Sequence, residues 1–173
     1  MHKFAGWQTP LVLAPRALHP WLNERGSLTQ RLKAHFPDFS VQVLRQDFAR
    51  PHRDERRPLA AGVAEVATRE VLLCSRGQAL VFAHSVVKRS ALRSGFHLLG
   101  RTGSRPLGAL LFADPTIRRS ALSFACLDRR HPLWQKANQA CGPLPARLWA
   151  RRSFFYAGQD ALLVTEVFLP PAF

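Results

Sequence analysis

The stretch Ala161-Leu-Leu-Val-Thr-Glu-Val-Phe-Leu-Pro170 decides how the rest of the chain is interpreted. Strands that are buried on both faces have near-continuous apolar sequences, as this stretch does. One carboxylate, Glu166, interrupts it, and a carboxylate in such a place must be paired, hydrogen-bonded, protonated or used in chemistry. A second charge, Arg69, interrupts the apolar run Thr68-Arg-Glu-Val-Leu-Leu-Cys74 in a similar way. The two stretches raise the question of whether Arg69 and Glu166 together form a site.

The bulk composition predicts one globular domain over residues 1–173, with residues 1–15 as an extended lead-in. The chain is 47% hydrophobic and 21% charged, which is typical of a folded protein with one core. Its three cysteines, Cys74, Cys126 and Cys141, have neither zinc spacing nor an even count, which favours a reducing compartment. The apolar runs are too short to span a membrane, and the N-terminus is a poor signal peptide. We therefore expect a cytoplasmic protein with no membrane span, and a monomer.

The formal net charge is +14, from 25 basic and 11 acidic residues. Such a balance admits nucleic acid, anionic lipid or a small anionic substrate as a partner, and does not choose among them. Much of the arginine lies in short clusters, with no basic stripe along a helix and no aromatic pattern typical of RNA binding. A solvated surface and the steering of an anion are therefore favoured over nucleic-acid binding, and no nucleic-acid partner is predicted.

Periodic segments predict strands with helical pieces before and between them. Ser27 resembles a helix N-cap, and Gln30 three residues later fits a capping box for a helix that Pro37 ends. Two hairpins are expected, one from 63–74 and 79–87 and one from 147–156 and 161–169. Other expected elements are a short helix over 15–24, a strand over 40–48, an exposed loop over 50–58, a short helix or turn over 90–99, a short apolar element over 109–112, a strand over 116–127 and a polar segment with a short helix over 128–145.

Strands that follow one another through short turns favour an antiparallel sheet. The predicted fold class is α+β: a single twisted antiparallel sheet with helices packed against one face.

Familiar catalytic and metal-binding motifs are absent from the sequence. The loop Gly100-Arg-Thr-Gly-Ser-Arg-Pro-Leu-Gly108 could offer backbone N–H groups and cations to an anion, although an ordinary surface loop is favoured. His84 is the only histidine in an apparent strand, and a satisfied core or surface histidine is favoured over a metal ligand. No metal and no cofactor are predicted.

Arg69 and Glu166 each alternate with apolar residues along their strands, so each shares a face with apolar groups. One interpretation is a structural buried ion pair, or an edge strand whose charge reaches solvent. The other is a small enclosed pocket with one cation and one carboxylate. Such a pocket would suit a ligand with a carboxylate at one end and a hydroxyl at the other. The spacing alone leaves both open.

Five motifs, in order over roughly residues 20 to 170, resemble the chorismate pyruvate-lyase family. They are Ser27-Leu-Thr-Gln-Arg-Leu, Arg69-Glu-Val-Leu-Leu-Cys, Pro106-Leu-Gly-Ala-Leu-Leu-Phe, Leu148-Trp-Ala-Arg-Arg-Ser and Leu163-Val-Thr-Glu-Val-Phe-Leu-Pro. The resemblance implies an antiparallel sheet of about six strands, with helical flaps over an internal ligand pocket. It implies a cofactor-independent carbon–oxygen lyase that cleaves chorismate to 4-hydroxybenzoate and pyruvate, towards ubiquinone.

The resemblance also implies roles for four residues. Arg69 matches the arginine that binds the ring carboxylate, and Glu166 matches the carboxylate that meets the ring hydroxyl. Leu28 and Leu107 match positions whose backbone N–H groups also hold the ring carboxylate. Leu28 stands where the family often has methionine. Two further departures are Lys88, where proline is common, and a longer segment over 128–145.

Three questions stay open at this stage. The second carboxylate of chorismate needs a cationic or N–H partner, for which Arg151, Arg152 and Lys88 are candidates. The hydrogen could move in a concerted step, or Glu166 could act as a general base. The main rival is a non-catalytic small-molecule-binding domain, because the fold also resembles the effector-binding domains of bacterial repressors. Those domains usually follow a DNA-binding region, for which we expect no room before Ser27.

Overall fold

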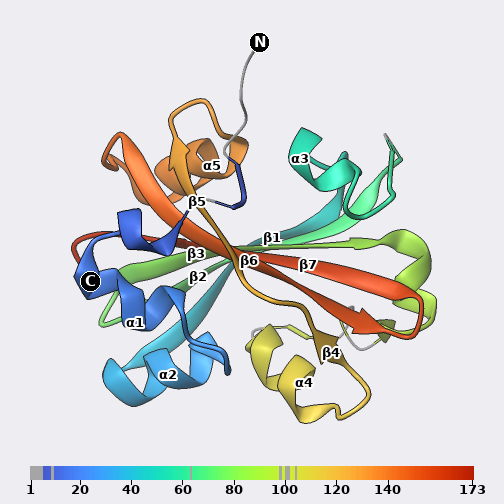
Figure 1. The fold of residues 1–173 in the computed structure, drawn as a ribbon. Helices are drawn as coiled ribbons and strands as arrows, with labels where there is room; N and C mark the ends of the chain where they lie inside the picture. The colour runs from blue at the N-terminus through green and yellow to red at the C-terminus, as the bar shows by residue number, and fades with distance from the viewer. Residues whose placement is uncertain (1–5, 9, 63, 98, 100–101, 104) are drawn as a thin grey trace.

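The fold is described from a computed structural model, which describes residues 6–8, 10–62, 64–97, 99, 102–103 and 105–173. Within these residues the strands form one sheet in the order β1-β2-β3-β7-β6-β4, with β5 also paired to β6 (Figure 1). Every pair of neighbouring strands is antiparallel, which confirms the α+β prediction. The seven strands are β1 (Phe39–Ala49), β2 (Val66–Ser75), β3 (Gln78–Lys88), β4 (Arg118–Arg119), β5 (Ser123–Asp128), β6 (Arg147–Ala157) and β7 (Asp160–Phe168).

The central strands β2, β3 and β7 are apolar because both of their faces are covered. Both predicted hairpins are present, β2 with β3 and β6 with β7. Each turn contains a residue with positive φ, namely Arg76 and Gly77 in the first and Gly158 in the second. The first hairpin begins at Val66 within the described residues, and the expected start at Val63 lies outside them. The predicted strand over 116–127 is divided into the short β4 and β5.

Helices cover both faces of the sheet, so the expectation that they pack against one face is wrong (Figure 1). On one face, α1 (His19–Leu22) and α2 (Leu28–His35) pack with Val71, Leu73 and Phe168, and α4 (Leu107–Ala113) packs with Phe155 and Leu162. On the other face, α5 (Pro132–Cys141) packs with Leu72, Phe82 and Val167. Two cores form because alternate residues of each strand point to opposite faces. Three short 3-10 helices complete the fold: η1 (Leu11–Leu13), η2 (Arg16–Leu18) and η3 (Arg89–Arg93).

Two segments that were expected to be irregular are ordered in the structure. The predicted exposed loop over 50–58 contains the one-turn helix α3 (Arg53–Arg56), whose Glu55 is buried. Within the predicted extended lead-in, Leu11–Leu13 form a 3-10 turn and Trp7 is buried in the α5 core, while residues 1–5 and 9 lie outside the described part. Both differences arise because buried partners from distant segments hold these residues: Trp7 Nε1 donates to Asp54 Oδ2 at 2.7 Å.

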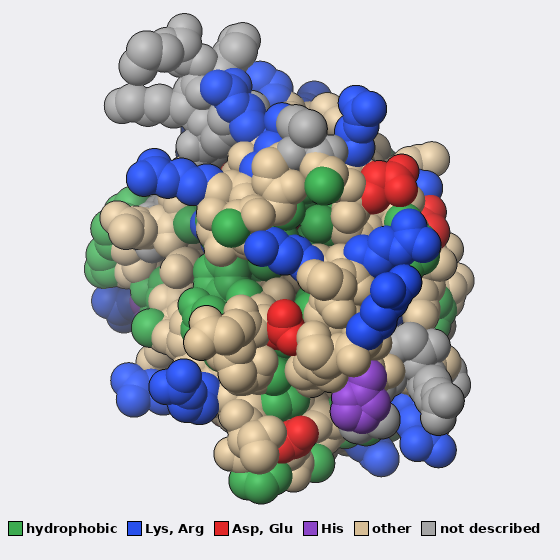
Figure 2. Space-filling view, turned by 90° about the vertical axis from the view of Figure 1, so that its right-hand side faces the viewer, with side chains coloured by type: hydrophobic (Ala, Val, Ile, Leu, Met, Phe, Trp, Pro, Cys, Tyr) green, Lys and Arg blue, Asp and Glu red, His purple; other side chains and the backbone are tan. Residues whose placement is uncertain are grey.

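On the face shown in Figure 2, the described Lys and Arg side chains form no single stripe. Figure 2 shows Lys and Arg side chains spread over one side of the molecule, with few acidic groups among them. This distribution agrees with a solvated basic surface and with a diffuse attraction for anions. In the described part of the chain, no helix is long and apolar enough to cross a membrane.

Candidate active site

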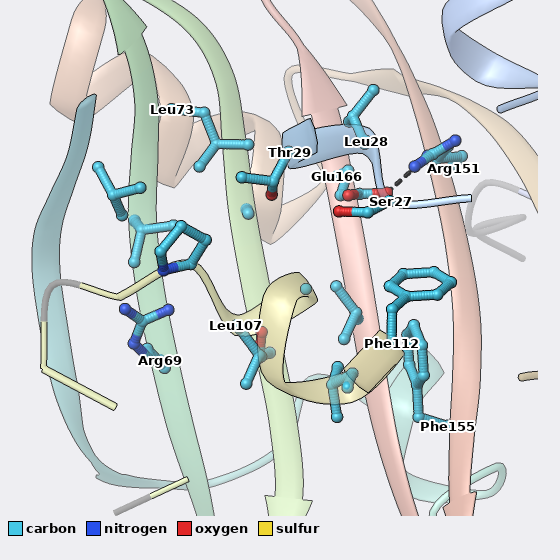
Figure 3. Close-up of a pocket in the computed structure, with 18 of the residues that line it drawn as sticks. Ser27, Leu28, Thr29, Arg69, Leu73, Leu107, Phe112, Arg151, Phe155 and Glu166 are labelled. Carbon is cyan, nitrogen blue, oxygen red and sulfur yellow. Dashed lines mark hydrogen bonds and ion pairs between the residues drawn. The ribbon is translucent and has the colours of Figure 1, made fainter. Parts of the chain in front are cut away.

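A pocket of about 50 Å³ lies between the sheet and the first turns of α2 and α4 (Figure 3). Its floor is formed by β2, β3, β6 and β7, and its walls include apolar side chains such as Leu73, Phe112 and Phe155. All four site residues predicted from the sequence line this one pocket: Leu28, Arg69, Leu107 and Glu166. A second cavity of about 200 Å³ adjoins it and shares only Arg69 and Leu107 of the four. The smaller pocket is therefore the candidate active site.

Arg69 lies at one end of the pocket, on β2 (Figure 3). Its Nη2 donates to the carbonyl oxygens of Gly103 at 2.9 Å and Arg105 at 3.2 Å. Its Nε is buried and makes no hydrogen bond with any described residue. Burial lowers the pKa of Arg69, because the charged form loses contact with water. The guanidinium is therefore held by the carbonyl groups of Gly103 and Arg105 and keeps a donor for an anion.

Glu166 lies at the other end of the pocket, on β7, and is paired with Arg151 of the neighbouring strand β6 (Figure 3). Arg151 Nε donates to Glu166 Oε2 at 2.5 Å. Arg151 is fully buried, and its Nη1 donates to the carbonyl oxygens of Trp21 at 3.1 Å, Leu22 at 3.4 Å and Glu24 at 2.7 Å. Glu166 is thus a member of a buried ion pair, but its partner is Arg151 and not Arg69.

Leu28 and Leu107 are the first residues of α2 and α4. N–H groups in the first turn of a helix have no partner within the helix. Ser27 caps α2 as predicted, because its side chain accepts from the Gln30 N–H at 3.3 Å. Among the described residues, the Leu28 and Leu107 N–H groups donate to no protein acceptor. The two helices meet over the pocket, where a Cβ added to Gly108 would lie 3.2 Å from Ser27 Oγ.

Sequence reasoning missed one charged residue of this pocket, Arg119 on β4. It was hidden in an arginine cluster that resembled ordinary surface charge. Of the three candidates for the second carboxylate, Arg151 lines the pocket but is paired with Glu166. Arg152 donates to Asp54 on the other face of the sheet, and Lys88 does not line the pocket.

A separate cluster of buried charges lies on the face of the sheet away from the pocket. His84 lies between Glu55, 3.1 Å from its Nε2, and Glu70, 3.2 Å from its Nδ1. Burial opposes the charged form of His84, but the two carboxylates raise its pKa. The pKa of Glu70 falls to about 2 despite its burial, because it contacts His84 and Lys136. His52, Glu55 and His84 are the described residues that could present donors to a metal ion, with ligand atoms within 4.8 Å of one another.

Comparisons with solved structures show the fold alone. The effector domain of PhnF from Mycobacterium smegmatis superposes with a TM-score of 0.54 at 15% identity, covering 84% of this chain and 89% of that one. A GntR-family transcriptional regulator from Bacillus cereus gives a TM-score of 0.56 at 10% identity, covering 79% and 94%. These values confirm the predicted likeness of the fold to repressor effector domains. At identities this low they assign no function to the chain.

Comparisons with sequences are more specific. The probable chorismate pyruvate-lyase of Thiobacillus denitrificans is 46% identical over 166 residues, which cover 95% of this chain and 89% of that protein. The probable chorismate pyruvate-lyase of Aromatoleum aromaticum is 48% identical over 164 residues, covering 93% and 89%. A family model described as chorismate lyase matches residues 1–173. The chain therefore belongs to the chorismate lyase family, whose reaction is that of a carbon–oxygen lyase.

Proposed function

We propose that this chain eliminates pyruvate from chorismate to give 4-hydroxybenzoate, with Arg69 on the ring carboxylate and Glu166 on the ring hydroxyl. The single observation that supports these roles is the placement of a cation and a carboxylate at opposite ends of one small pocket (Figure 3). The two oxygen functions of 4-hydroxybenzoate stand para to each other across a flat ring. A ligand of this shape therefore spans the pocket with each end against a complementary group.

In this proposal the ring carboxylate has three donors. Arg69 supplies the charge through its unpartnered Nε, while its Nη2 stays on the 103–105 loop. The N–H groups of Leu28 and Leu107 supply neutral donors from two helix N-termini, which favour negative charge. Because Leu28 acts through its backbone, its difference from the methionine common in the family leaves this contact intact.

The reaction converts a cyclohexadiene ring to an aromatic one. The C–O bond of the enolpyruvyl ether breaks, and the carbon that bears the hydroxyl loses its hydrogen. In a concerted path that hydrogen moves to the pyruvyl methylene carbon through a six-membered array. The products are then pyruvate and 4-hydroxybenzoate, with no atom left over. The protein's share is to hold one conformer of the substrate and to stabilise developing charge.

Glu166 accepts a hydrogen bond from the substrate hydroxyl and so raises the electron density on the carbon that loses hydrogen. Its ion pair with Arg151 fixes the position of the carboxylate, since Arg151 is itself anchored by three carbonyl oxygens. In the stepwise alternative, Glu166 takes the hydrogen as a proton and delivers it to the methylene carbon. Chorismate with deuterium at the hydroxyl-bearing carbon distinguishes the two paths. Two quantities are measured: the kinetic isotope effect on turnover, and the fraction of deuterium in the pyruvate methyl group that has been exchanged for solvent hydrogen.

The test is to incubate purified protein with chorismate and a chelator, and to measure 4-hydroxybenzoate and pyruvate separately. Both should appear in equal amounts. Arg69→Ala should weaken 4-hydroxybenzoate binding, and Glu166→Gln should lower turnover more than it lowers stability. If neither product forms while the protein is folded, the proposal is wrong. If Glu166→Gln loses fold and activity together, Glu166 has only a structural role.

We further propose that the protein acts as a monomer in the cytoplasm. Its three cysteines are free, as is usual in a reducing compartment. Size-exclusion chromatography with light scattering checks the monomer.

A further inference from the structure

We propose that Arg119 binds the second carboxylate of chorismate, the one on the enolpyruvyl group, and so makes the pocket selective for a dicarboxylate. This inference rests on the proposed function and names a residue that the sequence did not single out. It assigns the one charged group of the substrate that Arg69, Leu28 and Leu107 do not contact.

The structure of the substrate fixes where this partner must lie. The enolpyruvyl ether is on the ring carbon next to the one with the hydroxyl, so its carboxylate lies at the hydroxyl end of the molecule. If Arg69 holds the ring carboxylate and Glu166 holds the hydroxyl, the second carboxylate lies beside Glu166. An uncompensated carboxylate next to Glu166 would be repelled, so this end of the pocket needs a cation.

Three arginines line the pocket, and two of them are committed elsewhere. Arg69 lies at the opposite end (Figure 3). Arg151 is 0% exposed, and its charge is balanced by Glu166 at 2.5 Å. Its remaining nitrogen, Nη2, is buried and has no hydrogen-bond partner among the described residues, but the charge of this guanidinium is already balanced by Glu166. Arg119 is half-buried, and no described carboxylate lies within ion-pair distance of it. Among the described residues, its charge is therefore the unbalanced positive charge at the Glu166 end of the pocket, as that of Arg69 is at the other end.

Arg119 is held in place by contacts that leave one nitrogen unused. Its Nε donates to Ser153 Oγ at 2.8 Å, and its Nη1 donates to the carbonyl oxygens of Arg25 at 2.8 Å and Gly26 at 3.1 Å. Within the described part of the chain, its Nη2 makes no hydrogen bond. Because the guanidinium is already immobilised, a new hydrogen bond from Nη2 costs little side-chain entropy.

The aromatic rings and charges around Arg119 also favour the binding of an anion. The guanidinium lies over the rings of Phe112 and Phe155, each with its centroid 5.3 Å from the guanidinium carbon. Burial lowers the pKa of Arg119, and the charges of Arg151 and Glu166 act on it in opposite directions. Glu24 also acts on Arg119, and Glu24 is itself paired with Arg31. Counted together, three arginines and two carboxylates give this end of the pocket a net charge of about +1. A second carboxylate would neutralise this end of the pocket.

The test compares ligands with and without the second carboxylate. The variant is Arg119→Gln, with Arg119→Lys as the charge-retaining control. Loss of one charge-assisted hydrogen bond should lower kcat/KM for chorismate roughly 10- to 150-fold. The Kd of 4-hydroxybenzoate, which has no second carboxylate, should change less than about threefold. Arg119→Lys should recover part of the loss, because it keeps the charge without the fixed planar geometry.

A stable analogue separates this inference from the proposed reaction. We would measure binding of 3-carboxymethoxy-4-hydroxybenzoate and of its side-chain methyl ester to both proteins. The unmodified protein should prefer the diacid, and Arg119→Gln should lose that preference. If both ligands weaken equally, Arg119 only supports the loop at Arg25 and Gly26, and the inference is wrong. It is equally wrong if the variant turns over chorismate as the unmodified protein does. Failure of the unmodified protein to cleave chorismate would refute the proposed function instead, whatever the analogue shows.

Discussion

Replacing His84 with glutamine should lower the stability of the protein strongly and leave the geometry of the pocket unchanged. His84 is 1% exposed and is flanked by Glu55 at 3.1 Å and Glu70 at 3.2 Å. A protonated imidazole places its positive charge between the two carboxylates, although neither of its nitrogens makes a well-aligned hydrogen bond to a described residue. Glutamine keeps a hydrogen-bonding group of similar length but removes the charge, so two carboxylates remain buried with less compensation.

The expected size of the effect follows from this burial. Breaking a buried ion pair by removing one partner costs about 3–5 kcal/mol, because the other charge stays buried. For a chain of this size each 1 kcal/mol lowers Tm by roughly 2–4 °C, so Tm should fall by about 6–20 °C. Lys136 still contacts Glu70, which leaves Glu55 as the carboxylate most affected. Removing its charge as well, in His84→Gln/Glu55→Gln, should recover about 2 kcal/mol relative to additivity.

The contribution of this cluster to the free energy of unfolding should change with pH in a definite direction. The pKa of His84 is raised in the folded protein, so its stabilising charge is fully present below about pH 6.5 and is lost as pH rises through the folded-state pKa. The pKa of Glu70 is lowered to about 2, so its contribution is present above pH 4.5 and is lost as pH falls towards 2. The stability difference between unmodified protein and His84→Gln should therefore be largest between these limits and shrink at high pH.

The assay is urea unfolding at several pH values, with chorismate turnover measured per folded molecule at 25 °C. Turnover should change less than about twofold, since the cluster and the pocket lie on opposite faces of the sheet. Additive free energies within ~0.5 kcal/mol, or a deficit that grows with pH, would refute a charged His84.

Three further predictions concern the pocket and its surface. Arg151→Met should lower both stability, by about 3–5 kcal/mol, and kcat, because it leaves Glu166 and three carbonyl oxygens without their donor; unchanged kcat in the folded variant would show that Glu166 needs no orientation. Gly108→Ala should speed release of 4-hydroxybenzoate several-fold, because its Cβ would lie 3.2 Å from Ser27 Oγ and push the two helix starts apart. Adding Ser27→Ala should restore the release rate of the unmodified protein, and an unchanged rate in stopped-flow measurements of Gly108→Ala would contradict the prediction. The value of kcat/KM should fall as ionic strength rises from about 0.02 to 0.5 M, because a +14 protein attracts a dianion; a flat profile would argue against steering.

The sequence was sufficient for the sheet and for the residues at the two ends of the pocket. The hairpins followed from alternation and turn residues, and Glu166 and Arg69 were identified because a charge in an apolar run is conspicuous. The chain was identified as a member of its family from five motifs, and the family model and relatives confirm that. The roles of the four site residues remain predictions.

The sequence did not show which side chains contact the charged residues Glu166, Arg119 and Glu55. Arg151 lies opposite Glu166 in the β6–β7 hairpin, a register that the predicted strand ends at 156 and 161 already imply. Sequence spacing does not show that the two side chains form an ion pair, because that depends on the burial of Arg151. Arg119 resembled a surface arginine because its burial depends on Phe112 and Phe155 from other segments. Glu55 was placed in an exposed loop for the same reason: its partner His84 comes from a strand that is distant in sequence.

The Ser27–Gly108 contact has a consequence for how the enzyme can change over time. The groups that would handle the bond changes, Arg69 and Glu166, are on strands of the sheet, whereas Ser27 and Gly108 belong to two short segments laid over it. A substitution in these segments can alter how long the product stays bound while the strand positions of Arg69 and Glu166 are kept. We therefore expect substitutions of the Ser27 and Gly108 side chains to change product residence time more than chemical rate, as long as the backbone N–H groups of Leu28 and Leu107 keep their positions.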